Sequence, residues 1–391
     1  FTFTKQAVQE GKSRAMSRFG ITNNQLPFFR TLHSLCFFQL GLSKDSVMNG
    51  RDFNDLNQKL NLRLTGSISS DDGHVSGISK DDRLMFIENL ARMRQISLES
   101  QWHDSDDVVG WFELERFANG LRLFKNDRLL IDYTDMLQLF LDRGRAPKLD
   151  VMFVDEAQDL SPLQWAVVRK LCESADRIYI AGDDDQAIYR WAGADVDYLI
   201  RNSKDAMVLK QSYRIPKSIH TLAERCIGQV ASRVQKTWNP RKEAGHVSWE
   251  KSYESIDMES GDWLVLARTN YLLNGIEEHC RSEGWFYKTK NRNSVSEKKV
   301  KAVRDWETLR KGGEILLVDL IKVLNYMRVS VPTSLERNDF DSNISFEEAQ
   351  SYLPDLKQEY WYDLFDGISV SERSYIRAML RRGEKITKEP R

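Results

Sequence analysis

Two acid-rich strings carry the residues best suited to chemistry, and the first follows a short apolar run. Asp155 and Glu156 come directly after the apolar residues 149–154. A carboxylate pair at the end of a buried strand suits a Mg²⁺–nucleotide site, because one carboxylate can hold hydrated Mg²⁺ and the other can orient or deprotonate an attacking water. An ordinary acidic loop after a strand is the alternative interpretation.

The second string, residues 182–194, contains three consecutive aspartates, a glutamine and two aromatic residues. Gln186 has a neutral amide, which can sense a phosphate or a water without the cost of a charge. Tyr189 and Trp191 flank Arg190, and exposed aromatic rings interleaved with arginine can stack on nucleic-acid bases. Burial of both rings in the core is the alternative.

A third string, residues 209–216, contains an arginine shortly after an apolar run. Arg214 can reach a γ-phosphate if it lies at a strand end, as an arginine finger does. Tyr213 can pack on a base. Taken alone, the stretch favours an ordinary surface arginine.

The elements that must position these residues alternate between strands and helices. The apolar runs predict strands at 1–4, 149–155, 177–181, 206–209 and 263–267. Helical spacing predicts helices at 5–19, 28–42, 83–98, 132–141, 163–171, 218–230 and 272–283. Residues 65–82, rich in Ser, Gly and Asp, indicate a loop. Alternating strands and helices indicate a doubly wound α/β fold, in which ligands bind at the carboxyl ends of the strands.

Composition limits the class of protein. The chain has 391 residues, a net charge of −1 and 41% hydrophobic residues. This excludes a globally basic nucleic-acid coat protein and an acidic disordered chain, and the length predicts two or three domains. No apolar run of 18 residues occurs, so we expect no membrane span. The four cysteines are far apart, which predicts reduced buried thiols in a cytosolic protein, without disulfides or a zinc site.

Taken together and in this order, the three strings resemble those of UvrD/Rep-type superfamily 1 DNA helicases. The likeness extends to the TFT segment that ends at Thr4, to the segment around Thr31 and His33, and to the stretch that begins at Asp132. Downstream, residues 263–270 resemble a strand of the family's second motor domain. The likeness covers most of residues 1–290 and is weak in the helical tail.

The resemblance implies RecA-like parallel-sheet motor domains with helical insertions and with ATP bound between them. The first motor domain would span 1–208 with an insertion at about 45–125, the second 209–290, and a further insertion 291–391. Asp155 would bind Mg²⁺, Glu156 would be the general base, and Gln186 would couple the γ-phosphate to DNA. Tyr213 would stack on adenine and Arg214 would bind the γ-phosphate. The implied DNA contacts are Thr4, Thr31, His33, Tyr189, Trp191, Arg268 and Asn270.

The same resemblance implies ATP-driven 3′→5′ movement on single-stranded DNA, with duplex junctions as substrates and repair or replication proteins as partners. The location would be cytoplasmic, and nucleoid-associated in a bacterium or phage.

The phosphate-binding loop of this family, G-x-x-x-x-G-K-[ST], has no match in the sequence. Gly11, Lys12 and Ser13 come nearest, but Gln6 stands at the first glycine position. The family's late motifs, with their second phosphate-contacting arginine, are also absent. We therefore expect the chain to be a fragment that is inactive alone.

Two other functions stay open. A DNA-binding or partner-docking module that has lost its ATPase is the main alternative. An ATP-dependent nuclease subunit is a weaker one, because no nuclease carboxylate–lysine cluster is evident. The basic stretch 288–311 fits either a path for the phosphate backbone or a solvated helix face.

Overall fold

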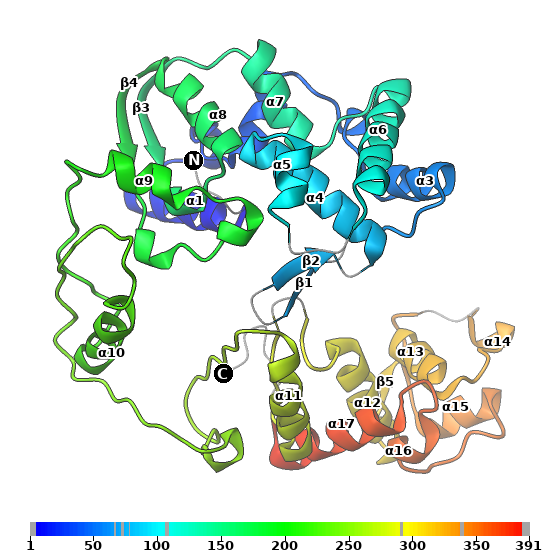
Figure 1. Cartoon of the computed structure of the whole chain (residues 1–391). Helices are drawn as coiled ribbons and strands as arrows, with labels where there is room; N and C mark the ends of the chain where they lie inside the picture. Colours follow the sequence, from blue (N-terminus) through cyan, green and yellow to red (C-terminus); the bar gives the residue numbers. More distant parts are fainter. Residues whose placement is uncertain are drawn as a thin grey trace. The chain divides into compact units, whose positions relative to one another are not determined.

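The computed structural model describes residues 5–65, 68–71, 74–77, 79–105, 109–289, 292–336 and 340–384. Its chain divides into two compact units, Phe1–Ser248 and Trp249–Arg391, which are described separately (Figure 1). Within the described residues, no helix combines the length and apolar character needed to cross a bilayer. The strand expected at 1–4 lies outside the described residues.

The first unit contains most of the strands and all of the acid-rich strings. Its helices are α1 (Lys5–Phe19), α2 (Leu32–Gln39), α3 (Gly50–Leu60), α4 (Lys80–Arg94), α5 (Leu98–His103), α6 (Trp111–Arg128), α7 (Tyr133–Arg143), α8 (Pro162–Cys172), α9 (Val196–Asn202) and α10 (Lys217–Ile227). Its strands are β1 (Ile68–Asp71), β2 (His74–Gly77), β3 (Leu149–Val154) and β4 (Ala175–Ile180). The antiparallel pair β1–β2 corrects the loop expected at 65–82.

The parallel pair β3–β4 is the sheet that positions the site. Val154 pairs with Ile180, so the two strands end side by side (Figure 1). The crossover helix α8 starts at a Ser161–Gln164 capping box, with Pro162 in its first turn, which fixes where the helix begins. One face of β3 joins α2, α7 and α8 in a common apolar core, to which Met152 belongs.

Two expected strands are absent from the described residues. Segments 206–209 and 263–267 are irregular, and Leu209, Leu264 and Leu266 are each about 80% exposed. An apolar run becomes a strand only where a neighbouring strand takes its backbone hydrogen bonds, and no described residue supplies that ladder here. The parallel sheet described for this chain therefore consists of β3 and β4.

Helices α3 to α6 surround a second apolar core in the first unit, which includes Leu56, Leu114 and Phe124. An ion network links these helices to α7: Lys125 Nζ lies 2.7 Å from Asp132 Oδ2, and Arg92 Nη2 lies 2.8 Å from the same oxygen. Burial alone would raise the pKa of Asp132, but these cations lower it. These helices occupy the segment expected to be an insertion, whose bounds stay a prediction.

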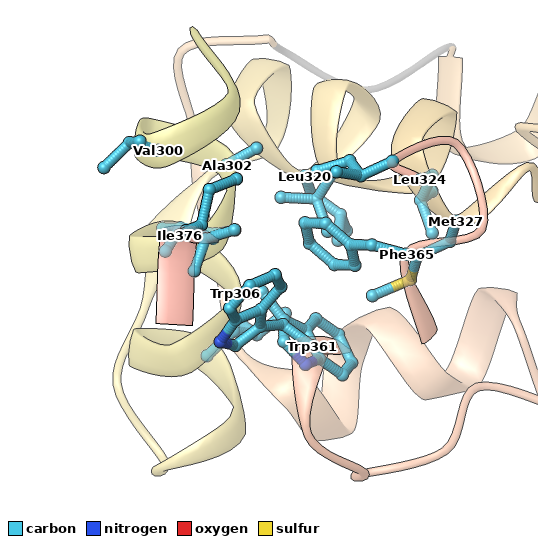
Figure 2. Packing of buried hydrophobic residues seen from close by; sticks show 14 of the residues in the cluster. Val300, Ala302, Trp306, Leu320, Leu324, Met327, Trp361, Phe365 and Ile376 are labelled. Atoms are coloured by element: carbon cyan, nitrogen blue, oxygen red, sulfur yellow. The ribbon is translucent and has the colours of Figure 1, made fainter. Parts of the chain in front are cut away.

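The second unit is mainly helical. Its elements are α11 (Tyr271–Glu283), α12 (Glu297–Arg310), β5 (Ile315–Leu316), α13 (Leu317–Met327), α14 (Thr333–Glu336), β6 (Asn343–Ile344), α15 (Phe346–Tyr352), α16 (Trp361–Leu364) and α17 (Val370–Arg382). Figure 2 shows part of its core, to which α12, α13, α16 and α17 contribute Trp306, Leu320, Trp361 and Ile376. All four side chains are at most 4% exposed, so this unit has an apolar core of its own.

The cysteine prediction is correct for two of the four thiols. Cys36 and Cys280 are buried, whereas Cys172 is half-buried and Cys226 is exposed. None of the four forms a disulfide. Burial raises the pKa of Cys36 to about 12, which keeps this thiol protonated and inert.

Candidate functional site

The carboxyl end of β3 presents Asp155 and Glu156 to solvent. Asp155 Oδ1 accepts a hydrogen bond of 3.1 Å from the backbone N–H of Glu156. Glu156 has left-handed backbone angles, φ 54° and ψ 42°, which are uncommon for a residue with a side chain. The turn thus ends the strand abruptly and leaves two exposed carboxylates next to each other.

Gln158, which the sequence reasoning did not single out, joins the ends of the two parallel strands. Its side chain is buried, with 2% of the residue exposed. Its Nε2 donates to Glu156 Oε2 at 2.7 Å, and its Oε1 accepts from the backbone N–H of Asp183 at 3.0 Å. A Cβ on Gly182 would lie 2.9 Å from this Oε1, so a glycine there permits the close approach.

The loop after β4 holds Gln186 by a local hydrogen bond. Gln186 Nε2 donates to Asp183 Oδ2 at 2.6 Å, and Asp183 caps the short 3₁₀ helix Asp184–Gln186. Burial would raise the pKa of Asp183, but the ammonium of Lys236 and the amide of Gln186 lower it below its ordinary value. Glu156 and Gln186, both singled out from the sequence, are therefore linked through Gln158 and Asp183.

Two cations from the segment after α10 bind the same loop. Arg233 forms two hydrogen bonds to Asp185, of 2.8 and 2.6 Å. Lys236 Nζ lies 2.8 Å from Asp183 Oδ1 and 2.9 Å from Asp185 Oδ2, and it also pairs with Asp184. The Arg233 and Lys236 side chains are only 7% and 13% exposed. The sequence reasoning missed both, because nothing in their local pattern distinguishes them from surface cations.

Tyr189 and Trp191 lie on the continuation of this loop. Their ring centroids are 6.0 Å apart with planes tilted by 49°, and Trp191 is 39% exposed. Arg190, between them, pairs with Asp197 at 3.1 Å. Neither ring is fully buried, so the alternative that both belong to the core is wrong.

Tyr213 and Arg214 are both exposed, and Tyr213 is 86% exposed. Their turn is held by the Ser212 hydroxyl, which accepts from the backbone N–H groups of Arg214 and Ile215. Among the described residues, no side chain pairs with the Arg214 guanidinium, and no contact joins it to Asp155 or Glu156. It is thus a cation available to an anion from outside the chain.

The remaining expected DNA contacts are spread over the chain. Thr31 caps α2 by accepting from the Ser34 N–H at 3.3 Å, and His33 packs edge-on against Tyr133. Burial lowers the pKa of His33, which keeps the ring neutral near pH 7.

Arg268 and Asn270 are exposed in the second unit, directly before α11. Thr4 lies outside the described residues. The structure thus links Glu156, which directly follows Asp155, to Gln186. The expected DNA contacts that it describes lie on separate elements: α2 and the loop after β4 in the first unit, and the start of α11 in the second.

The pKa of Asp159, four residues after Asp155, depends on the charge of this site. Burial and the neighbouring Glu156 carboxylate raise the pKa of Asp159 to about 6. Its Oδ1 is buried and has no hydrogen-bond partner within the described ranges. A carboxyl group in this position resists ionisation until Glu156 is neutralised or a cation approaches.

The residues at the end of β3 suit a hydrated cation with one or two protein ligands better than a metal ion coordinated mainly by protein side chains. Within the described part of the chain, no cluster of three or more His, Cys, Asp or Glu residues is placed to hold a metal. Mg²⁺ usually keeps several waters and takes only one or two protein carboxylates. Asp155 suits that role, because it is exposed and only one of its oxygens accepts the Glu156 N–H.

Three cations of the basic stretch 288–311 are paired within the second unit. Lys299 Nζ lies 2.7 Å from Glu372 Oε2, and Lys301 Nζ lies 2.8 Å from Asp305 Oδ2. Arg310 pairs with Glu307. Lys298 is exposed and has no ion pair among the described residues, so it is a cation of this helix that is available to a phosphate.

Comparison with known proteins supports the family resemblance of the first unit. The model of the family described as "UvrD/REP helicase N-terminal domain" matches residues 1–207. The ATP-dependent DNA helicase PcrA of Bacillus subtilis is 25% identical over 333 residues, which are 80% of this chain and 42% of that protein.

A probable DNA helicase II homolog of Mycoplasma capricolum is 28% identical over 240 residues, 56% of this chain and 32% of the relative. PcrA of Staphylococcus aureus is 25% identical over 252 residues, 60% of this chain and 34% of the relative. The chain thus spans less than half the length of these curated relatives. With the family model covering more than half of its residues, the chain belongs to the UvrD/REP helicase family.

Proposed function

We propose that the complete protein is an ATP-dependent DNA helicase that moves 3′→5′ on single-stranded DNA and unwinds duplex junctions. The observation that carries the proposal is the Gln158 side chain, which bonds both Glu156 and the loop of Gln186. A motor must transmit the state of its hydrolytic site to its DNA contacts, and Tyr189 and Trp191 follow Gln186 on the same loop. The names of the relatives support the class of activity.

Each residue has a role that its position permits. Asp155 would hold Mg²⁺, which when bound neutralises phosphate charge. Glu156 would take the proton of the attacking water, since its carboxylate is exposed and oriented by Gln158. Gln186 would contact the γ-phosphate through its neutral amide and so couple the phosphate to the DNA contacts. Tyr213 would stack on the adenine base of ATP.

Arg214 would complete the site by binding the γ-phosphate. The support for this role is its guanidinium, which has no ion-pair partner within the described residues and is available to an outside anion. We further propose that two RecA-like motor domains, 1–208 and 209–290, enclose the nucleotide, and that 291–391 is an insertion.

DNA would be bound mainly by base stacking and by a few polar contacts. Trp191 is exposed enough to stack on a base, and such stacking tolerates any sequence. Thr4, Thr31, His33, Tyr189, Arg268 and Asn270 would lie along the strand. Repair or replication proteins would be the partners.

Single-stranded-DNA-stimulated ATPase activity tests the proposal, measured on this chain and on the product of the complete reading frame. We expect turnover by the complete protein and none by this chain, which contains no G-x-x-x-x-G-K-[ST] loop. Glu156→Gln should lower kcat by about 10²- to 10⁴-fold, as expected when a general base is lost, while DNA affinity stays within about threefold because the residue contacts no DNA in this proposal.

Two results would contradict the proposal. Micromolar Mg-ATP affinity with turnover by this chain alone would refute its expected inactivity. Absence of ATPase activity in the complete protein, with DNA binding intact, would favour a binding module that has lost its ATPase.

A further inference from the structure

The three aspartates of the loop after β4 are all paired with cations from a distant part of the chain. Arg233 and Lys236 lie about 50 residues from the aspartates that they bind. Lys236 Nζ contacts Asp183, Asp184 and Asp185, and the Val234 backbone N–H donates to Asp184 Oδ2 at 2.7 Å. We call Arg233 and Lys236 the cation clamp.

The clamp acts on a loop whose conformation decides where Gln186 points. Asp183 accepts the Gln186 amide through Oδ2, and its Oδ1 accepts both the Lys236 ammonium and the backbone N–H of Asp185. The backbone N–H of the same aspartate is held by Gln158, which also holds Glu156. Lys236 therefore connects to Glu156 through Asp183 and Gln158, with hydrogen bonds or ion pairs at every step.

The segment that carries the clamp is also tied to the segment of Tyr213 and Arg214. Asn239 N–H donates to Lys210 O at 2.6 Å, and Ser212 N–H donates to Asn239 O at 2.8 Å. Asn239 lies only three residues beyond Lys236, so a shift of one end of this segment moves the other. One short segment thus contacts both the loop of Gln186 and the turn of Arg214.

We propose that Arg233 and Lys236 are positioning residues, which fix the position of the loop 183–186 relative to the turn that carries Arg214. This inference rests on the proposed function, because the catalytic consequence exists only if the complete protein hydrolyses ATP. The clamp touches neither nucleotide nor DNA in this proposal, and it acts through Asp183 on Gln186. Its two positive charges also reduce the net charge of the three aspartates from −3 to about −1, which an apolar contact would not achieve.

The test compares Lys236→Met with Lys236→Arg and with a matched control, Lys242→Met. Lys242 is an exposed lysine on the same segment, without an ion pair in the described part of the chain. In the complete protein, Lys236→Met should lower kcat by about 10- to 100-fold with a KM for ATP within about threefold, because Lys236 stabilises the arrangement needed in the transition state. Lys236→Arg should restore most of kcat, and Lys242→Met should change neither constant.

Hydrogen exchange of the loop amides, measured on this chain without nucleotide, provides an independent readout. Residues 183–187 should exchange at least about tenfold faster in Lys236→Met than in Lys242→Met, because the loop opens locally once its clamp is lost. Equal exchange in the two variants would refute the clamp. Faster exchange with an unchanged kcat would refute its role in hydrolysis. Absence of ATPase activity in the unsubstituted complete protein would instead refute the proposed function, and the exchange result would still decide whether the clamp holds the loop.

Discussion

Gln158 offers the sharpest test of how the candidate site is built. Gln158→Leu keeps a side chain of similar size in the buried position but removes both hydrogen bonds. We expect the first unit to become less stable, and we expect the loop after β4 to lose its link to Glu156. No nucleotide is needed to observe either effect.

The expected magnitude follows from the partners that Gln158 leaves behind. Glu156 is exposed, so water replaces the lost amide and this bond costs little net free energy. The Asp183 N–H lies at a partly buried position, and a donor left unsatisfied there costs about 1–3 kcal/mol. Leucine returns part of that through apolar contact, so we expect a net loss of about 1–2 kcal/mol in the free energy of unfolding.

Urea titration, followed by hydrogen exchange of the β3 and α8 peptides, measures the free energy of unfolding of the first unit separately from that of the second. Gln138→Leu is the matched control, since Gln138 is an exposed glutamine whose amide bonds Asp142 within its own helix. Its cost should stay below about 0.5 kcal/mol, as for most exposed substitutions. If Gln158→Leu costs no more than the control, Gln158 does not hold the strand ends together, and the argument for the site fails.

Asp159 and the basic helix α12 supply two more predictions. The raised pKa of Asp159, about 6, means that the free energy of unfolding falls as pH rises from about 4 to 6, where only the unfolded carboxyl loses its proton. Asp159→Asn should remove this fall, and urea midpoints from pH 4 to 7 measure it; a difference between the two proteins that does not vary with pH would contradict the assignment. In α12, Lys298→Glu should lower the slope of log DNA affinity against log salt by about 1 or slightly more, if this exposed lysine contacts a phosphate. Lys299→Glu should instead destabilise the second unit, because it breaks the pair with Glu372 and places two carboxylates together. An unchanged slope for Lys298→Glu, measured by DNA binding across salt concentrations, would assign the helix face to solvent.

Local sequence pattern was sufficient to place the residues at the ends of β3 and β4. An apolar run that ends in acids indicates a buried strand with a polar carboxyl end, and parallel neighbours bring those ends together. Asp155, Glu156 and Gln186 could therefore be chosen without coordinates. The same reasoning was wrong at 206–209 and 263–267, where the apolar pattern is present but no described strand pairs with it.

The missed residues depend on tertiary contacts that no local pattern encodes. Gln158 lies inside a string that the sequence reasoning did consider, and a neutral amide between two acids was the available signal. Arg233 and Lys236 gave no such signal, since their partners lie about 50 residues earlier in the chain. Only the fold shows that these cations are buried against Asp183, Asp184 and Asp185.

The distribution of charge explains why the cation clamp matters for a polyphosphate ligand. The three aspartates carry three negative charges and the clamp supplies two positive ones, which leaves the loop with a net charge near −1. Three unpaired carboxylates within a few ångströms would repel a phosphate strongly at the low dielectric of a partly buried site. With the aspartates paired, the carboxylate of Asp155 and the guanidinium of Arg214 are two groups without an ion-pair partner within the described residues; the first suits Mg²⁺ and the second suits a phosphate. In the proposed function, the clamp therefore holds Gln186 in place through Asp183 and also lowers the negative potential that a polyphosphate ligand would meet.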